Sequence, residues 1–251
     1  MTEILVEISD VSKQFGKGPP ALSQISASIA KGEMVGLAGP DGAGKTTLLR
    51  LIAGLLLPTT GTIRIGPYDT IKDASQIRHL IGYMPQKFGL YEDLTVQQNL
   101  NLYADLRGIP QSEMQALFEK LLQFTGLSPF TGRLAGALSG GMKQKLGLAC
   151  ALMKKPTLLL LDEPSVGVDP LSRRELWKMV HELLQGGISV IWSTAYLDEA
   201  ERCASVIVLD QGKLLFKGRP QDVTEKVKGR VFSIGPVVGN LRTVLTKTLC
   251  E

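Results

Sequence analysis

A short glycine-rich segment, GPDGAGKT at residues 39–46, constrains this chain more than any other feature. It fits the phosphate-binding pattern G-x-x-x-x-G-K-[S/T] over its whole length. The apolar run at 34–38 predicts a buried strand before it, and residues 46–56 predict a helix after it. A strand, a tight loop and a helix in this order are the context that the motif requires, so the segment predicts an α/β fold with a binding site at the strand's end.

The chemistry of the loop suits a nucleotide polyphosphate. Glycines let backbone N–H groups approach a phosphate, and N–H groups at a helix N-terminus attract anions. Lys45 adds a positive charge for the β- and γ-phosphates, and the hydroxyl of Thr46 is a ligand for Mg²⁺. A dinucleotide fingerprint is the weaker interpretation, because it leaves the Lys-Thr pair unexplained. The residues expected at ATP in this loop are Gly39, Pro40, Asp41, Gly42, Ala43, Gly44, Lys45, Thr46 and Thr47.

Two adjacent carboxylates, Asp162 and Glu163, follow a second apolar run at residues 157–161. Such a run is typical of a strand buried on both faces, and ligands bind beyond the carboxyl ends of such strands. The two side chains are expected to point in opposite senses along the strand and so to have different roles. We expect Asp162 to hold Mg²⁺ through water, and Glu163 to orient or deprotonate the attacking water.

A second anion site is predicted at residues 138–145, which read LSGGMKQK and are called the signature segment below. Ser139 is expected to cap the apolar helix that runs through Leu152, and Gly140 and Gly141 to expose the first N–H groups of that helix. One nucleotide cannot easily use both anion sites. The second site is therefore expected to serve a nucleotide held by a partner.

The order of these motifs resembles that of ABC-type ATPases over roughly residues 3–228. The resemblance implies an α/β fold with a P-loop NTPase core, a mainly parallel sheet, an antiparallel β layer and an inserted α-helical subdomain at about 88–155. It also implies that the chain binds Mg-ATP and hydrolyses it. Two such nucleotide-binding domains would close head to tail, with each signature segment capping the γ-phosphate of the other.

The resemblance gives roles to three further segments. Gln86, in the sequence YMPQ, matches the Q-loop glutamine, which implies contact with Mg²⁺ and the attacking water and a share in catalysis. Residues 165–170 match the D-loop. Phe15 lies where members of the family place an aromatic ring against adenine, and packing in the core is the alternative for this residue.

The resemblance is closer still to the first half of tandem ATP-binding subunits of bacterial multidrug exporters, chiefly on residues 82–96 and 129–136. It implies separate permease subunits, with this chain held by them at the cytoplasmic face of the inner (plasma) membrane. We expect the permease to dock on residues 87–92, where large apolar residues follow the Q-loop glutamine, and packing of these residues into the helical subdomain is the alternative.

The ABC-type domain is expected to occupy residues 1–228, with 229–251 as a C-terminal extension. A strand pattern at 230–234 and half of an amphipathic helix at 240–250 carry more apolar residues than disorder usually does. The extension is either a disordered tail or the start of a linker in a longer polypeptide, and its composition favours the second.

Two positions depart from the family pattern. Ala195 stands where the family normally has a histidine that contacts the γ-phosphate and the catalytic carboxylate, so a charge-stabilising donor is missing. Asp41 replaces the usual asparagine in the phosphate loop. The two histidines of the chain, His79 and His181, are expected to be structural. We therefore expect secure nucleotide binding and slow hydrolysis.

Two alternatives to an exporter ATPase stay open at this point. A catalytically degenerate half that gates a competent partner site would explain Ala195. A soluble ABC ATPase acting on ribosomes or DNA is the other, although the net charge of +4 is small and evenly spread and does not favour nucleic acid.

Composition sets further bounds. Cys150, Cys203 and Cys250 have no metal-binding spacing, and three cysteines suit a reducing cytosol. The first residues lack the basic start of a signal peptide. No apolar run approaches the roughly twenty residues that a membrane span needs, so membrane work is expected to go through a partner.

Local signals predict two strands, two helices and a hairpin. Alternating patterns at 4–8 and 22–29 predict strands of an antiparallel layer. A capping box beginning at Thr95 starts a helix, and a further helix is expected at 171–184. Gly212 marks the turn of a hairpin.

Overall fold

The computed structural model describes residues 3–87 and 89–222. The chain divides into a unit of residues 1–220 and a second unit of residues 221–251. The boundary expected at residue 228, and the strand and half-helix expected after it, lie outside the described residues. The architecture below is that of the first unit.

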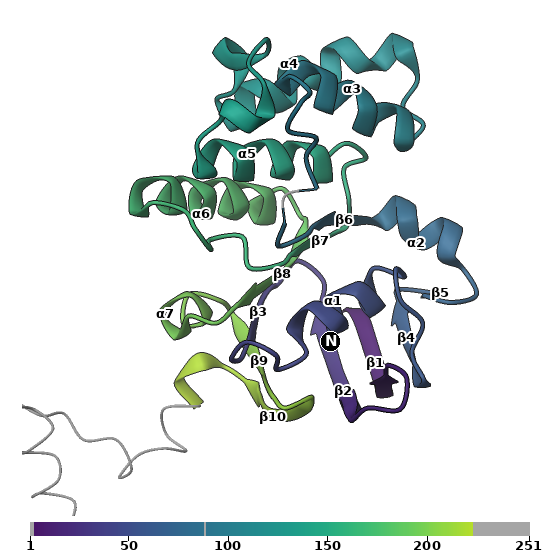
Figure 1. Ribbon diagram of the computed structural model, residues 1–251. Helices are drawn as coiled ribbons and strands as arrows, with labels where there is room; N and C mark the ends of the chain where they lie inside the picture. Colours follow the sequence, from purple (N-terminus) through teal and green to yellow (C-terminus); the bar gives the residue numbers. More distant parts are fainter. Residues whose placement is uncertain (1–2, 88, 223–251) are drawn as a thin grey trace, which may run out of the picture. The chain divides into compact units, whose positions relative to one another are not determined.

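The larger sheet of this unit has six strands in the order β10-β9-β3-β8-β7-β6 (Figure 1). Five of them run parallel, and only β10 is antiparallel to its neighbour. The hairpin expected at Gly212 is confirmed, and it joins β9 to β10. The mainly parallel sheet is therefore confirmed, with strands β3 (Met34–Ala38), β6 (Ile81–Met84), β7 (Leu158–Leu161), β8 (Ser189–Thr194), β9 (Ser205–Asp210) and β10 (Lys213–Gly218).

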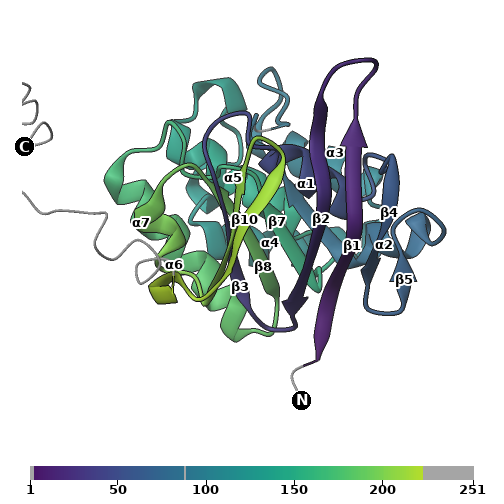
Figure 2. The same cartoon turned by 90° about the horizontal axis from the view of Figure 1, so that it is seen from below.

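The expected antiparallel layer is a second sheet, of order β2-β1-β4-β5. Figure 2 shows its two long strands, β1 and β2, running side by side. Their inward apolar side chains share a core with the larger sheet and with α1 (Lys45–Ile52), the helix after the phosphate loop. The strands of this layer are β1 (Ile4–Gln14), β2 (Pro20–Ala30), β4 (Thr60–Ile65) and β5 (Tyr68–Asp69).

Helix α1 is shorter than its apolar pattern predicts. It was expected to reach Leu56 but ends at Ile52. Gly54 follows with a φ of 68°, a left-handed conformation that terminates helices. The leucines beyond it therefore belong to a turn, and Leu55 is largely exposed.

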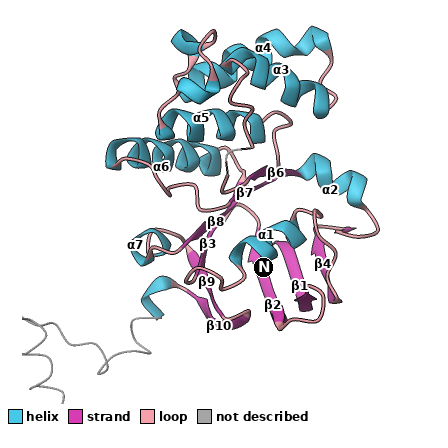
Figure 3. Ribbon diagram, viewed as in Figure 1, coloured by secondary structure: helices cyan, strands magenta, loops and turns pink. Residues whose placement is uncertain are grey.

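The expected helical insertion is confirmed between β6 and β7 (Figure 3). The predicted capping box is present, with Thr95 accepting from the Gln98 backbone and the Gln98 side chain accepting from the Thr95 backbone. Leucines, alanines and a phenylalanine from the helices pack into one core with β7 and α6. The elements are α3 (Val96–Leu106), α4 (Gln111–Thr125), two short 3₁₀ turns at Ser128–Phe130 and Ala135–Ala137, and α5 (Gly140–Ala151).

A small backbone ladder joins the segment after Gln86 to the loop before the signature segment. Residues 92–97 and 131–136 form an antiparallel bridge at Thr95 and Leu134. Four backbone hydrogen bonds support it, namely Val96 N to Arg133 O at 2.9 Å, Gln97 N to Thr131 O at 3.0 Å, Ala135 N to Leu94 O at 2.8 Å and Gly136 N to Glu92 O at 2.9 Å. This ladder was not predicted, because its two segments are far apart in the sequence.

Three helices complete the unit. The helix expected at 171–184 is α6 (Pro170–Gln185), while α2 (Ala74–Leu80) and α7 (Leu197–Ala200) were not predicted. His79, expected just before a strand, lies in the last turn of α2. Among residues 3–87 and 89–222, the structure contains no helix with the length and apolar character needed to cross a bilayer.

Candidate active site

The predicted residues of the phosphate loop, Gln86 and the two carboxylates gather at one edge of the larger sheet, whereas Phe15 and the signature residues do not line the cavity there. The phosphate loop follows β3, Gln86 follows β6, Asp162 and Glu163 follow β7, and Ala195 follows β8. These four strands are parallel and adjacent, so their carboxyl ends meet. The structure thus brings together segments that lie more than one hundred residues apart in the chain.

The backbone of the phosphate loop depends on glycine. Gly42 and Gly44 have φ angles of 78° and 103°, in the left-handed region. A Cβ on Gly44 would also lie only 2.8 Å from the Ala21 carbonyl oxygen. Gly44 is the N-cap of α1 and supplies no side-chain cap, so the first N–H groups of α1 are left to other acceptors, such as an anion.

Lys45 is buried and makes three polar contacts. Its Nζ atom lies 3.0 Å from Oε1 of Glu163, and it donates to the carbonyl oxygens of Gly39 at 2.7 Å and Pro40 at 3.0 Å. The other oxygen of Glu163 accepts from Nε2 of Gln86 at 2.8 Å. The cation of the loop, the second carboxylate and the Q-loop amide therefore form one connected cluster.

Asp162 lies at the other end of the cluster. Its Oδ1 atom accepts from Thr46 Oγ1 and from Ser193 Oγ, each at 3.0 Å, and its Oδ2 atom accepts from the Tyr83 hydroxyl at 3.2 Å. Burial raises the pKa of Asp162 above its ordinary value, although these donors oppose the shift. Burial, with the nearby Asp162 charge, also raises the pKa of Tyr83 to about 12.

Sequence reasoning missed Tyr83 and Ser193. Tyr83 lies on β6 and Ser193 on β8, the two neighbours of β7, so the strand order was needed to place them. Ser193 Oγ also accepts from the backbone N–H of Glu163 at 2.9 Å. One hydroxyl thereby contacts both acidic positions, and the only available signal was that Ser193 directly follows the apolar run at residues 190–192.

The expectation that the two carboxylates point in opposite senses is wrong. The strand β7 ends at Leu161, and Glu163 adopts a left-handed φ of 49°, so strand alternation does not apply. Both carboxylates reach the phosphate loop, at the neighbouring residues Thr46 and Lys45. They still have different partners, because one contacts a hydroxyl and the other an ammonium group.

The donor set fits a magnesium ion. Thr46 Oγ1 and Asp162 Oδ1 are 3.0 Å apart and present two hard oxygen ligands at one point, as Mg²⁺ prefers. Beside them, a cavity of about 260 Å³ is lined by loop residues 41–47 with Gln86 and Glu163. Among the described residues there is no cluster of three or more His, Cys, Asp or Glu side chains that would hold a metal without such help.

The signature segment is absent from the lining of this cavity. Ser139 does cap α5 as predicted, accepting from the Met142 N–H at 3.3 Å. Phe15 is also absent from the lining; it is 51% exposed, with Lys13 Nζ 5.0 Å from its ring centre. Core packing is therefore the wrong alternative for Phe15, and its contact with adenine stays a prediction.

Ala195 lies beside the phosphate loop. The carbonyl oxygen of Thr194 accepts from the N–H of Gly39 at 3.3 Å, so the exposed Ala195 is the next residue past this contact. Neither histidine lines the cavity. His79 lies 3.2 Å from Lys154 Nζ through Nδ1, and His181 lies 3.0 Å from the Trp177 carbonyl oxygen, which agrees with structural roles.

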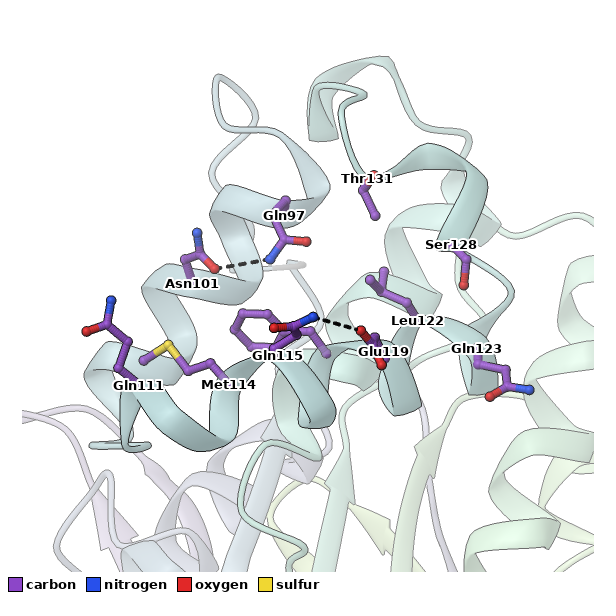
Figure 4. Close-up of a pocket in the computed structure, with 11 residues that line it drawn as sticks. Gln97, Asn101, Gln111, Met114, Gln115, Glu119, Leu122, Gln123, Ser128 and Thr131 are labelled. Atoms are coloured by element: carbon purple, nitrogen blue, oxygen red, sulfur yellow. Dashed lines mark hydrogen bonds between the residues drawn. The ribbon is translucent and has the colours of Figure 1, made fainter.

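A larger cavity, of about 720 Å³, lies in the helical insertion between α3 and α4 (Figure 4). Its rim is rich in amides that bond to neighbours, as Gln97 does to Asn101 at 3.1 Å and Gln115 to Glu119 at 3.2 Å. Its lining residues include one carboxylate and no cation. A polyphosphate would find no charge partner there, so the smaller cavity is the candidate site.

The family model for ABC transporters matches residues 22–166, a span that contains the phosphate loop, the Q-loop glutamine, the signature segment and both carboxylates. The chain belongs to the ABC transporter family. This ABC chain is 53% identical, over 99% of its length, to the probable multidrug ABC transporter ATP-binding protein YbhF of Escherichia coli (strain K12). It spans 43% of that protein, which is less than half of the relative's length.

A second relative of this ABC chain is the linearmycin resistance ATP-binding protein LnrL of Bacillus subtilis (strain 168), which is 34% identical over 90% of this chain and 72% of LnrL. Among solved structures, the dimeric post-hydrolysis state of the ATP-binding cassette MJ0796, bound to ADP and Pi, superimposes with a TM-score of 0.78. It is 26% identical and covers 86% of this chain and 99% of the other. The ABC ATPase fold is therefore shared along almost the whole described unit.

Proposed function

We propose that this ABC chain binds Mg-ATP and couples its binding and hydrolysis to export by separate permease subunits of a multidrug-type exporter. The observation that carries the proposal is the connected cluster of Lys45, Glu163, Gln86, Asp162 and Thr46 at one sheet edge. The similarity to YbhF and LnrL supports the export role, since both are named as drug-transport or drug-resistance ATP-binding proteins. A ribosomal or DNA-directed ATPase has no comparable support.

The contacts of Lys45, Thr46, Asp162 and Glu163 suggest a separate role for each in nucleotide binding and hydrolysis. Lys45 exchanges Glu163 for the β- and γ-phosphates, while the loop N–H groups surround those phosphates. Thr46 and Asp162 would hold Mg²⁺, with Gln86 nearby, and the ion would supply positive charge against the phosphates. Glu163, released from Lys45, orients or deprotonates the attacking water, and Gln86 stays within hydrogen-bonding reach of its carboxylate.

A second nucleotide-binding domain completes the site in this proposal. The signature residues Ser139, Gly140 and Gly141 do not line the chain's own cavity, which supports their use on a nucleotide held by the partner domain. The two domains would close head to tail, either as two chains or within one longer polypeptide.

The permease is proposed to dock on residues 87–92 at the cytoplasmic face of the membrane. Tyr91 is 56% exposed and Leu90 is partly buried, so this segment presents apolar surface. Phe88, which was expected to contribute, lies outside the described residues. The partner helix would then touch the residues that follow Gln86, the group that contacts Glu163.

Ala195 supports a second version of the proposal. In this version the chain binds ATP, hydrolyses it slowly and regulates a catalytically competent site on the partner domain. Ala195 directly follows Thr194, whose carbonyl oxygen contacts the phosphate loop, and its methyl group supplies no donor that could stabilise developing charge. Both forms share the nucleotide site and differ in turnover.

The test is to measure Mg-ATP binding of the isolated chain by calorimetry and its turnover over a wide range of protein concentration. We expect binding by a mostly monomeric chain with slow turnover, because each site lacks a second signature segment. The Lys45→Ala variant should lose most of the binding, since it removes the only side-chain cation in the phosphate loop. Fast turnover that does not change with concentration would contradict the proposal.

A further inference from the structure

The two signature glycines lie directly on the D-loop of their own chain. A Cβ on Gly140 would be 2.9 Å from the carbonyl oxygen of Gly167. A Cβ on Gly141 would overlap both the Cβ and the Oγ of Ser172, and would lie 3.7 Å from Asp169 Oδ2. Neither glycine has a positive φ, so backbone conformation does not require glycine here. The requirement comes from space, because helix α5 begins in contact with the D-loop and the start of α6.

Ser172 cannot easily turn away from Gly141. Asp169 caps α6 and accepts from the N–H groups of Leu171 at 3.1 Å and Ser172 at 3.0 Å. A hydrogen bond from the Ser172 side chain to the same carboxylate is the main reason that the pKa of Asp169 is lowered. Moving the Ser172 side chain would break this bond, and moving its Cβ would displace the first turn of α6.

The D-loop also begins at the candidate site. The N–H of Val166 donates to the carbonyl oxygen of Glu163 at 3.2 Å, which closes a turn directly after the second carboxylate. One short stretch, residues 163–172, therefore begins with Glu163 of the candidate site. The same stretch contains Gly167 and Ser172, the residues that contact the two signature glycines. Farther along the two helices, an ion pair between Lys145 Nζ and Glu175 Oε2 at 2.6 Å adds a second contact between α5 and α6.

We propose that Ser172 is a positioning residue that sets where the start of α5 lies over the D-loop, and that residue 141 is glycine in order to admit Ser172. The inference rests on the proposed function and deepens it. The contact with Ser172 would fix the position of the signature segment, and this position determines whether the segment reaches the partner's nucleotide. It differs from the view that Gly141 lacks a side chain solely to admit the partner's phosphate. In that view Ser172 has no influence on the outcome.

An exchange of volume between the two positions tests the proposal in the full 251-residue chain. Gly141→Ala should lower the unfolding temperature by about 2–10 °C, as overpacking does in a unit of this size. It should also weaken ATP-dependent pairing at least tenfold. Adding Ser172→Gly removes both overlapping atoms, and the double variant Gly141→Ala/Ser172→Gly should regain most of both properties, while Ser172→Gly alone should show a smaller defect.

Two matched double variants serve as controls for the steric contact between Gly141 and Ser172. Gly141→Ala/Ser172→Ala retains the overlapping Cβ, so it should not recover. Gly140→Ala/Ser172→Gly should not recover either, because Gly140 meets the backbone of Gly167 rather than Ser172. Recovery of all three double variants alike would overturn the proposal. The effect of substituting Ser172 would then not depend on its steric contact with Gly141.

The two readouts separate this inference from the proposed function. If Gly141→Ala/Ser172→Gly regains its unfolding temperature but not its ATP-dependent pairing, Gly141 serves the partner and the positioning role is wrong. If the single variant Gly141→Ala loses neither property, the steric premise is wrong. If the unmodified chain does not bind ATP, the proposed function fails, while recovery of the unfolding temperature still reports on the contact between Gly141 and Ser172.

Discussion

The Nζ atom of Lys45 lies 3.0 Å from Oε1 of Glu163, so the cation assigned to a phosphate is already paired with the carboxylate assigned to the attacking water. Both side chains are buried, at 4% and 8% exposure. Removing one partner of such a pair typically costs about 3–5 kcal/mol, because a charge is left buried without its counter-charge. A nucleotide must therefore compete with Glu163 for Lys45.

Glu163→Gln is expected to raise ATP affinity by roughly fivefold, or about 1 kcal/mol, because a neutral amide releases Lys45 more readily. Hydrolysis should fall by about a hundredfold or more, since the general base is lost. Calorimetry with Mg-ATP and single-turnover assays in the assembled complex would measure both effects. An affinity unchanged by the substitution would show that the ion pair does not compete with the nucleotide.

Asp162→Asn is expected to stabilise the nucleotide-free chain at neutral pH while abolishing Mg²⁺-dependent ATP binding. Burial raises the folded-state pKa of Asp162, so its contribution to stability is present at low pH and is lost as pH rises through that pKa. Thermal unfolding at several pH values should show the variant's advantage at neutral pH and its loss under acid conditions.

A control with the opposite sign is available for that measurement. Hydrogen bonds from Ser172 and from backbone N–H groups lower the pKa of Asp169, so Asp169 stabilises above its ordinary range and loses this effect as pH falls. Asp169→Ala should therefore lower the unfolding temperature at neutral pH. Equal shifts in both variants would contradict the assignment for Asp162.

Ala195→His is expected to raise ATP hydrolysis tenfold or more, because it restores a donor beside the phosphate loop where transition-state charge develops. The gain should appear only in an assembly that supplies a competent opposite signature segment. Ala195→Phe, which adds bulk without a donor, is the control. No gain from histidine in the reconstituted complex would mean that another group already compensates for Ala195.

Tyr91→Ser is expected to reduce co-purification with the permease subunits severalfold and to leave ATP affinity unchanged, since the exposed ring is not part of the nucleotide cavity. Leu215→Ser, at an exposed apolar position on β10, is the matched control and should change neither property. If both properties survive in Tyr91→Ser, the docking surface lies elsewhere. If both collapse, Tyr91 supports the fold.

Much of the fold was predictable from local patterns. The leucines of 158–161 indicated a strand buried on both faces, and the capping box at Thr95 located the start of α3. Helix α1 was predicted too long because its apolar pattern continues past Gly54, whose left-handed backbone ends the helix. Helix α2 was missed because Ile77 is its single buried residue, too few to make a helical period visible.

For the site, sequence reasoning could name the groups but not their pairing. Lys45 and Glu163 each belonged to a motif, yet their ion pair depends on β3 and β7 both neighbouring β8 in the sheet. Tyr83 carried no motif at all and is recognised only through its bond to Asp162. Spatial neighbours from separate strands need the sheet order, which is a property of the whole chain rather than of any segment.

The ladder between residues 92–97 and 131–136 has a consequence for how this unit opens. Each of its four bonds joins the two segments, so neither segment can lose its backbone partners while the other keeps them. Local opening proceeds in cooperative units rather than residue by residue. Hydrogen–deuterium exchange should therefore proceed at similar rates for four amide protons, those of Val96, Gln97, Ala135 and Gly136. These rates should agree although about forty residues of sequence separate the two segments.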